Sequence, residues 1–196
     1  NAVEGIYQST PEGRYLSSNP AHARMLGYST PEEVVSDIID VGAQVYVNPE
    51  DRARFCECLD KDGVVRQFEF PALKKDGERI WVSNSARTVR DAAGNLLYYE
   101  GTMEDITRIK KGEEDLKASA DKLRKSLAAT IEVISMMLET RDPYTAGHQR
   151  RVSKLARSIA QEMGFSGDVI DTVRMAASIH DIGKMSVPAE ILAKPT

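Results

Sequence analysis

The chain has 196 residues, of which 41% are hydrophobic and 29% are charged, which is the composition of an ordinary globular protein. Its formal net charge of −4 gives no basic field, so binding to a nucleic acid polymer is disfavoured. No apolar run approaches the ~18 residues of a membrane-spanning helix, and no signal peptide is evident. We therefore expect a soluble cytoplasmic protein, with Cys56 and Cys58 as reduced thiols.

Strand-like segments and turns dominate the chain up to about residue 107. A hairpin is predicted over residues 6–18, and short helices are predicted over 20–26, 30–39 and 49–59. Three longer strands follow at 64–73, 79–89 and 96–103, joined by connections that contain Asp and Gly. This order predicts a five-stranded antiparallel sheet with helices on one face, and hence an α+β fold.

Residues 105–140 contain no proline and a single glycine, Gly112. In a heptad frame that starts at Ile106, eight of the ten core positions are apolar, while charged residues fill the positions between them. This pattern predicts a coiled-coil helix that joins two copies of the chain. The alternative is a single amphipathic helix that lies on its own domain. We favour the homodimer, because a two-position stripe is narrower than the face of a helix docked on a globule.

Helical character continues after a predicted break at Asp142-Pro143. One helix is predicted from Thr145 to Met163, and its apolar residues fall on a single face that His148 extends. A second helix, capped by Ser166, leads to His180. Both histidines are therefore predicted to lie on inward faces of neighbouring helices.

The most distinctive motif is His180-Asp181-Ile182-Gly183-Lys184, with His148 upstream, in a chain that has only three histidines. Adjacent His and Asp side chains can offer nitrogen and oxygen ligands to one divalent metal. A lysine beyond a glycine turn can pair with a phosphate, so the set suits metal-assisted hydrolysis of a phosphoester. The alternative is a group of hydrogen-bonded core residues, but a buried Asp beside a buried His would then need its charge paired.

The segments around these residues resemble the HD-GYP family of the HD superfamily. The resemblance rests on Glu139 to His148, Arg150-Arg151-Val152, Ala176 to Lys184, Val187-Pro188 and Ile191 to Pro195. It implies a phosphodiesterase of cyclic di-GMP with two or three metals, usually iron or manganese. By this resemblance His148, His180 and Asp181 are metal ligands, Asp181 and Lys184 are catalytic, and Lys184 contacts the substrate phosphate.

This sequence departs from the family pattern in two places. Tyr144 stands where some members have a glutamate for a third metal, which favours two metals. The later histidines, the closing aspartate and the Gly-Tyr-Pro segment of the family do not occur in the 196 residues. We therefore expect a truncated HD-type domain that is catalytically incomplete by itself. Two other interpretations stay open: a sensing and dimerisation module without catalysis, and an HD hydrolase of another nucleotide.

The first half of the chain resembles PAS sensor domains. The resemblance covers residues 3–107 and rests on these segments in order: Gly5-Ile6-Tyr7, Asn19-Pro20-Ala21, Met25 to Tyr28, Pro49 to Arg52, Lys75-Asp76-Gly77, Ile80-Trp81, and Glu100-Gly101 with Asp105-Ile106-Thr107. It implies a domain that binds haem, flavin or a small metabolite, or nothing, between the sheet and the helices. Together the two resemblances predict a PAS sensor at 3–107, a signalling helix at 108–140 and an HD-type domain at 141–196.

The ligand of the sensor is narrowed by exclusion. The predicted helix at 49–59 has no histidine, and His22 is expected to be a surface or packing residue, so haem is disfavoured. Cys56 and Cys58 do not stand in the motif of a photoreactive flavin domain. A small apolar or acidic metabolite remains, with Trp81, Arg66 and Arg87 as candidate pocket residues. A domain that binds no ligand and only dimerises is the alternative.

Overall fold

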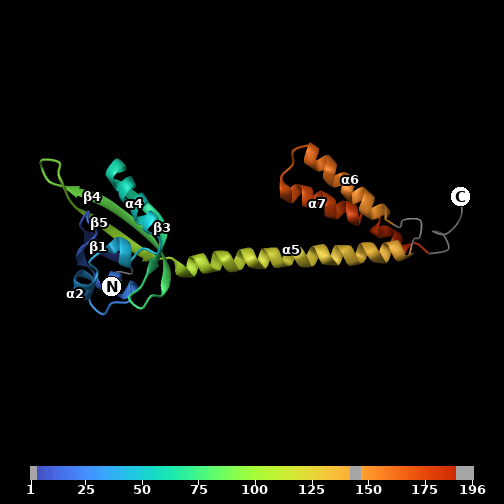
Figure 1. Ribbon diagram of the computed structural model, residues 1–196. Helices are drawn as coiled ribbons and strands as arrows, with labels where there is room; N and C mark the ends of the chain where they lie inside the picture. The colour runs from blue at the N-terminus through green and yellow to red at the C-terminus, as the bar shows by residue number, and fades with distance from the viewer. Residues whose placement is uncertain (1–3, 142–146, 189–196) are drawn as a thin grey trace. The chain divides into compact units, whose positions relative to one another are not determined.

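The computed structural model describes residues 4–141 and 147–188, and the chain divides into two compact units, residues 1–114 and 115–196 (Figure 1). The predicted break at Asp142-Pro143, the position of Tyr144 and the motif at Ile191 to Pro195 lie outside the described residues. Among the residues that are described, no helix has both the length and the apolar character needed to cross a bilayer.

The first unit contains a five-stranded antiparallel sheet, which confirms the predicted fold. The strands are β1 (Gly5–Ser9), β2 (Tyr15–Ser18), β3 (Val64–Leu73), β4 (Arg79–Arg90) and β5 (Leu96–Asp105), in the spatial order β2-β1-β5-β4-β3. Gly77 and Gly94 have φ angles of 84° and 87° in the turns that flank β4, where a side chain would strain the backbone. Turn residues and period-two alternation thus position all five strands.

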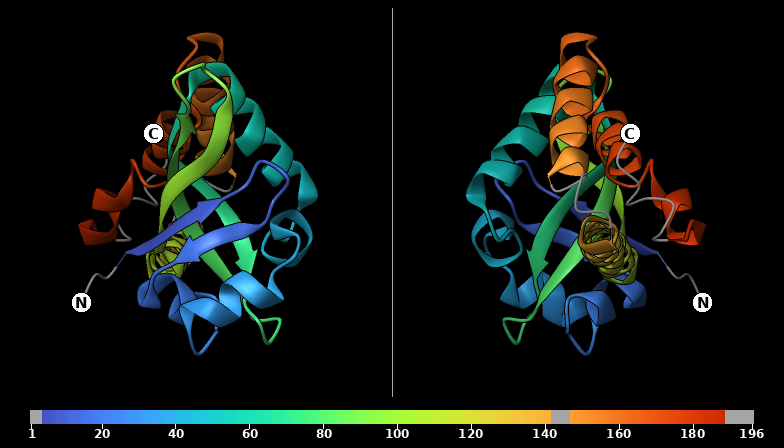
Figure 2. Two further views of the ribbon diagram at one scale, coloured as in Figure 1. Left: turned by 90° about the vertical axis from the view of Figure 1, so that its left-hand side faces the viewer. Right: turned by 90° about the vertical axis from the view of Figure 1, so that its right-hand side faces the viewer.

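Four helices between β2 and β3 cover one face of the sheet (Figure 2). They are α1 (Pro20–Met25), α2 (Pro31–Asp37), α3 (Val41–Gln44) and α4 (Pro49–Asp62). Sequence reasoning missed α3, which has only four residues and begins at the capping side chain of Asp40. Prolines in the first turns of α1, α2 and α4 supply a preset φ where no backbone hydrogen bond is lost.

The core of the first unit consists of two hydrophobic clusters. The larger one lies between the sheet and the helices α1, α2 and α3. In it the rings of Tyr46 and Phe70 stack with their centroids 4.0 Å apart. The smaller one lies under α4, where Phe55 and Leu59 are fully buried against β3, β4 and β5. Burial of these side chains is the main source of stability for the first unit.

His22 lies inside the larger cluster, which settles its role as a packing residue. Its ring is fully buried, stacks on Tyr7 at 5.2 Å and meets the edge of Tyr15 at 5.0 Å. Nδ1 lies 2.9 Å from the Ser18 hydroxyl, and burial lowers the pKa of His22 to about 4. The histidine is therefore neutral at ordinary pH.

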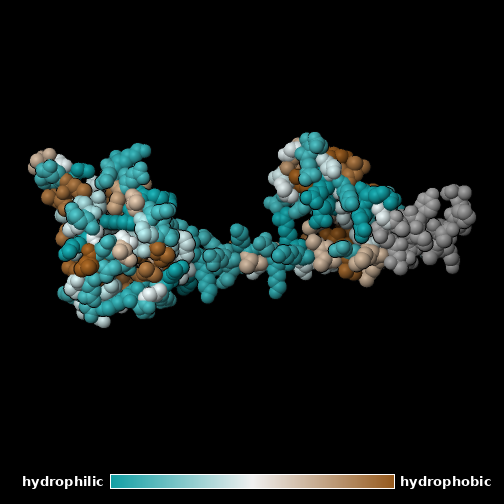
Figure 3. All heavy atoms as spheres, viewed as in Figure 1, coloured by the Kyte–Doolittle hydropathy of each residue, from teal (hydrophilic) through white to brown (hydrophobic). Residues whose placement is uncertain are grey.

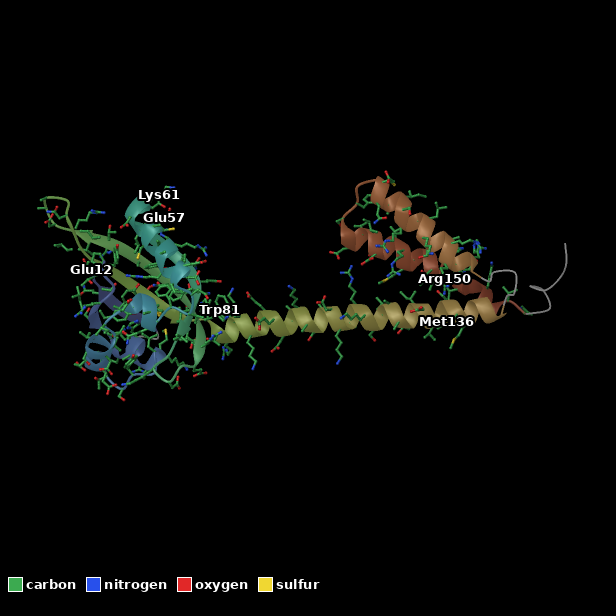
Figure 4. All side chains as sticks on the ribbon, in the orientation of Figure 1. Glu12, Glu57, Lys61, Trp81, Met136 and Arg150 are labelled. Atoms are coloured by element: carbon green, nitrogen blue, oxygen red, sulfur yellow. The ribbon has the colours of Figure 1, made fainter. Side chains whose placement is uncertain are left out.

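The sheet continues directly into a long helix, α5 (Thr107–Arg141). The Ile106 amide donates to the Trp81 carbonyl at 2.9 Å, and the Trp81 amide donates to the Thr107 hydroxyl at 2.9 Å. Lys110 then forms an ion pair with Glu69 at 2.6 Å and lies over the Trp81 ring at 5.6 Å. Figure 4 labels Trp81 at this junction. The first turn of α5 is thereby fastened to β3 and β4.

The predicted heptad stripe of α5 is solvent-exposed within the chain. Its apolar members Leu116, Leu123 and Leu127 are 73%, 71% and 52% exposed, although leucine is usually buried. Hydrophilic residues dominate much of the visible surface of this helix (Figure 3). A narrow, uncovered apolar stripe on a polar helix is the pattern expected of a coiled-coil partner face.

The second unit adds a helical hairpin of α6 (His148–Glu162) and α7 (Gly167–Ser178), followed by a 3-10 helix, η2 (Ile182–Ser186). The prediction that the apolar stripe of α6 faces inward holds only in part. Ala160 is buried, together with Gln149 and Ser153, but Leu155, Ile159 and Met163 are 63%, 51% and 64% exposed. The reason is that α6 packs on α7 through small and polar side chains: Ser153 donates to the Arg174 carbonyl at 3.0 Å.

Candidate metal centre

The ends of two packed helices bring the predicted ligands together. α6 begins at His148, directly after Gly147, whose φ of 72° turns the chain into the helix. α7 ends at Ser178, so that His180 and Asp181 lie in the turn that leads into η2. The three candidate ligands therefore lie at the ends of the α6–α7 hairpin rather than within a long loop.

The three predicted ligands form one cluster. One ligand atom each from His148, His180 and Asp181 lies within 4.8 Å of the other two. The two imidazole rings are 5.6 Å apart between centroids, and His180 Nε2 lies 3.4 Å from Asp181 Oδ2. The His180 side chain is 39% exposed, so the cluster can be reached from solvent.

A backbone contact fixes the tautomer of His180. Its Nδ1 lies 2.9 Å from the Ala177 carbonyl oxygen, which can only accept, so Nδ1 must carry the proton. The lone pair is thereby left on Nε2, which is the atom nearest Asp181. Orientation of a metal-binding imidazole by a hydrogen bond to its other nitrogen is the usual arrangement in metal sites.

Asp181 is held by two further side chains. Lys184 Nζ donates to its Oδ2 at 2.8 Å, and Gln149 Nε2 lies 3.4 Å from the same oxygen. The lysine contact, with smaller contributions from His180 and His148, lowers the pKa of Asp181 below its ordinary value. The carboxylate is therefore ionised and available as an anionic ligand at neutral pH.

The donor set fits a divalent transition metal. Two imidazole nitrogens and one carboxylate oxygen are ligands that iron, manganese and zinc all accept. The fit rests on the convergence of the three atoms and on the exposed Nε2 lone pair of His180. Lys184 was predicted to contact a substrate phosphate; the structure places it on Asp181, at the edge of the same cluster.

A groove of about 580 Å³ lies beside the cluster in the second unit. It is formed by α5, α6 and α7, and Figure 4 labels Arg150 and Met136 on two of its walls. Its cationic lining residues are Lys125, Arg150, Lys154, Arg157 and Arg174, against a single acidic one, Glu132. Gln149 lines the groove and also contacts Asp181, so the groove and the cluster share a wall. Such a lining favours an anionic ligand.

The predicted sensor-pocket residues do not face the space between the sheet and the helices. Trp81 and Arg87 alternate with the buried Ile80, Val82 and Ala86 along β4, so both side chains lie on the opposite face of the sheet. Arg66 is exposed as well, beside the bulge at Gln67. This prediction therefore needs correction: Trp81 belongs to the junction with α5, and Arg87 pairs with Glu100 at 3.2 Å.

Two polar residues escaped sequence reasoning. Gln149 directly follows His148 and is only 2% exposed, while Arg52 on α4 points its guanidinium among the rings of Tyr46, Phe55 and Tyr99. A glutamine next to a candidate ligand could have been considered as its support. Arg52 stands three residues before Phe55 and seven before Leu59, so helical spacing puts it on the buried face of α4, whereas Arg54 lies off that face.

Comparison with known proteins agrees with this architecture. A family model described as a PAS domain matches residues 3–108, which is more than half of the chain, and a model described as an HD domain matches residues 132–196. The chain therefore belongs to the PAS domain family. More particularly, it joins a PAS domain to an HD domain, and the HD match includes the last turns of α5.

Two curated relatives are named as cyclic di-GMP phosphodiesterases. One from Thermotoga maritima is 42% identical over 69 residues, which is 35% of this chain and 19% of the relative. A second from Vibrio cholerae, described as probable, is 30% identical over 156 residues, which is 76% of this chain and 32% of the relative. The chain thus spans about a fifth to a third of the length of these relatives.

A solved structure supports the fold of the first unit. An RNA-binding light-oxygen-voltage receptor aligns with a TM-score of 0.51 and 21% sequence identity, covering 62% of this chain and 35% of that chain. At that level of identity the likeness concerns the fold alone. The fold of the first unit is therefore one that this receptor shares.

Proposed function

We propose that this chain is the sensing and metal-binding part of a signalling protein, in which the PAS domain controls a metal-dependent phosphodiesterase of cyclic di-GMP. The observation that carries the proposal is the convergence of His148, His180 and Asp181 within 4.8 Å at the ends of α6 and α7. Support for the substrate comes from the two relatives named as cyclic di-GMP phosphodiesterases.

His148, His180 and Asp181 would hold the metal, which we expect to be iron or manganese. When bound, such an ion supplies Lewis-acid assistance to phosphoester hydrolysis. Lys184 offers a positive charge at the edge of the cluster, 2.8 Å from Asp181, and would offset negative charge that develops on a phosphoryl group. The cationic side chains of the neighbouring groove would hold the phosphates of the dinucleotide.

We further propose that the 196-residue chain binds metal but does not turn over substrate steadily. The cluster offers three ligands, while a two-metal phosphodiesterase site needs several more to hold both ions. The remaining imidazole of the chain, that of His22, is fully buried in the first unit and cannot supply one.

Control would pass through α5 in a homodimer. The exposed leucine stripe would pair with the same stripe of a second copy, and the contacts of Lys110 with Glu69 and Trp81 would couple the sheet to the first turn of the helix. A change in the sheet would then alter the rotation or register of α5. Without a competent metal site the chain would be a sensing and dimerisation module, which is the main alternative.

Binding and turnover of cyclic di-GMP test the proposal together. The manganese-loaded chain should retain radiolabelled cyclic di-GMP in equilibrium dialysis, with affinity weakened about tenfold or more in the Lys184→Ala variant and unchanged in Lys61→Ala, an exposed lysine of α4. Steady hydrolysis would contradict the incomplete site. Absence of retention, or tighter retention of another cyclic dinucleotide, would contradict the proposed substrate.

The dimer has its own test. Light scattering at increasing protein concentration should give the mass of two chains, and Leu123→Asp should reduce it to one by placing a charge in the apolar stripe. Lys122→Asp, a change next to it but off the stripe, is the control and should keep the dimer. A monomeric wild-type chain would overturn the dimeric helix.

A further inference from the structure

Two side chains of α5 contact the two ends of α7 within the second unit. Arg124 forms ion pairs near the start of α7, with Asp168 at 3.0 Å and with Asp171 at 2.6 Å. Further along α5, the Ser135 hydroxyl donates to the carbonyl oxygen of Ser178, the last residue of α7, at 2.8 Å. The Arg124–Asp171 and Ser135–Ser178 contacts join residues 47 and 43 positions apart in the chain, so they fix how α7 lies on α5.

The spacing of these contacts fits two helices that run in the same direction. Arg124 and Ser135 are about three turns apart, which places them on one side of α5 and about 16 Å from each other along its axis. By the same rise per residue, Asp168 and Ser178 are about 15 Å apart along α7. Because the two spans agree, both contacts can form at once along straight helices. Together they set the register of α7 on α5.

The side of α5 that contacts α7 differs from the side that carries the apolar stripe. Leu116 and Leu123 lie about 80–100° around the helix from Arg124. Their side chains are 73% and 71% exposed, so α7 does not cover them. One helix can therefore contact α7 and a second copy of the chain at the same time.

The Ser135 contact lies directly before the candidate metal ligands. The last carbonyl groups of a helix have no partner within that helix, and two neighbouring ones are used here. The Ala177 carbonyl oxygen holds Nδ1 of His180 at 2.9 Å, while the Ser178 carbonyl oxygen accepts from Ser135. Asp181 follows His180 in the same turn. A side chain of α5 thus holds the peptide group at the start of the turn that bears two of the three candidate ligands.

α6 is joined to the same end of α7. The Ser178 hydroxyl donates to the Ser153 hydroxyl of α6 at 3.0 Å, and Ser153 donates in turn to the Arg174 carbonyl at 3.0 Å. Ser153 is only 7% exposed, so this contact is shielded from water. α6 carries the third candidate ligand, His148, at its first position. The three helices are therefore connected to one another beside the metal centre.

We propose that Arg124 and Ser135 are positioning residues of the metal centre, an inference that rests on the control through α5 proposed above. Arg124 fixes the first turns of α7 and Ser135 fixes its last carbonyl, so that a shift of α5 is carried to His180 and Asp181. Exposed ion pairs contribute little free energy, and the role of this one is to set the register of two helices. Loss of either contact leaves every ligand present but less well aligned, which lowers metal affinity.

Amide hydrogen exchange in the metal-free 196-residue chain tests the positioning role first. The Ile179 amide donates to the Ala176 carbonyl at 3.2 Å and the Ile182 amide to the Ile179 carbonyl at 3.0 Å, so both amides report on order in the turn. Ser135→Ala should speed their exchange about 2–10-fold, the effect of one hydrogen bond. The Met163 amide, at the far end of α6, should exchange as in the wild type, which distinguishes a local change from a loss of the fold.

Manganese affinity, measured by calorimetry, is the second readout. Ser135→Ala and Arg124→Gln should each weaken binding about tenfold while the number of ions bound stays at the wild-type value. Ser135→Thr keeps the hydroxyl and should restore the affinity. Ser126→Ala is the matched control: it makes the same change at an exposed serine of α5 and should bind as the wild type does.

Three results would overturn the proposal. The first is unchanged exchange of the Ile179 and Ile182 amides in Ser135→Ala, and the second is a Ser135→Thr variant that binds as weakly as Ser135→Ala. The third is equal manganese affinity of the wild type, Ser135→Ala and Arg124→Gln, which contradicts the positioning role alone. A wild-type chain that binds no manganese would contradict the metal centre and the positioning role together.

Discussion

The two units use histidine in opposite ways. In the first unit His22 is fully buried, its Nδ1 lies 2.9 Å from Ser18, and burial keeps it neutral. In the second unit His180 is 39% exposed and its Nε2 lies near a carboxylate. The environment of each histidine, rather than the residue type, therefore makes the His22 imidazole a packing group and the His180 imidazole a candidate ligand.

The same contrast holds for apolar side chains. Those of the first unit form two closed clusters under the helices, whereas α6 leaves Leu155, Ile159 and Met163 exposed. The first unit is thus stabilised mainly by its own core. In the second unit, α6 and α7 pack through small and polar side chains, such as Ser153, whose hydroxyl donates to the Arg174 carbonyl at 3.0 Å.

Truncating one apolar residue in each unit should give the largest difference. Phe70→Ala should lower the free energy of unfolding by about 3–5 kcal/mol, because Phe70 is fully buried and stacks on Tyr46. Leu155→Ala should cost about 0.5 kcal/mol or less, because its side chain is already 63% exposed. Urea unfolding followed by Trp81 fluorescence and by far-ultraviolet ellipticity measures both. Equal losses would remove the contrast between the units.

Acid should destabilise the first unit through His22. The folded protein keeps this histidine neutral down to its pKa of about 4, whereas the unfolded chain binds a proton below about 6.5. Stability is therefore complete above pH 6.5, falls as the pH drops toward 4 and levels off below that, with a loss of about 2–3 kcal/mol by pH 4.5. His22→Phe should lack this component in urea titrations at pH 7 and 4.5. An unchanged pH dependence in the variant would mean that His22 accepts a proton in place.

Alanine substitution at two glycines should change the free energy of unfolding by smaller amounts, because the space around the two positions differs. A Cβ atom on Gly101 would lie 2.6 Å from the Tyr7 hydroxyl, which is bonded to Asn84, so Gly101→Ala should cost about 1–3 kcal/mol. Gly112 in α5 has no neighbouring atom within 4 Å, so Gly112→Ala should stabilise by up to about 1 kcal/mol through helix propensity. Thermal unfolding should show a lower melting temperature for Gly101→Ala and a higher one for Gly112→Ala. A higher melting temperature for Gly101→Ala would show that the hydrogen-bonded Tyr7 and Asn84 side chains move aside at little cost.

Local patterns predicted most of the fold. The five strands follow from alternation and from turns such as Lys75-Asp76-Gly77, and the long helix from a stretch without proline. His148 and His180 were predicted on inward faces of neighbouring helices; the structure brings them together with Asp181, but His180 is 39% exposed in the turn after α7. These features depend on near neighbours in the chain, which a single sequence contains.

The face on which a side chain lies, and the distant residues that it contacts, were harder to predict. Trp81 was assigned to an interior pocket, although the apolar Ile80 and Val82 on either side of it indicate by alternation that Trp81 faces outward. The exposure of Leu155, Ile159 and Met163 depends on which face of α6 packs against α7. Helical spacing puts Arg52 on the face of α4 that contains Phe55 and Leu59, but its approach to Tyr99 and the contact of Gln149 with Asp181 join residues far apart in the chain.

Metal binding by the 196-residue chain is the most direct test of the central claim. Manganese or iron titrated into the metal-free protein, and metal content measured after gel filtration, should give at least one ion per chain. Asp181→Asn and His180→Ala should abolish this binding, while Asp168→Asn, which changes an aspartate that is 87% exposed in the same unit, should leave it intact. A wild-type chain that retains no ion, or an Asp181→Asn variant that retains it fully, would contradict the assignment of the metal centre.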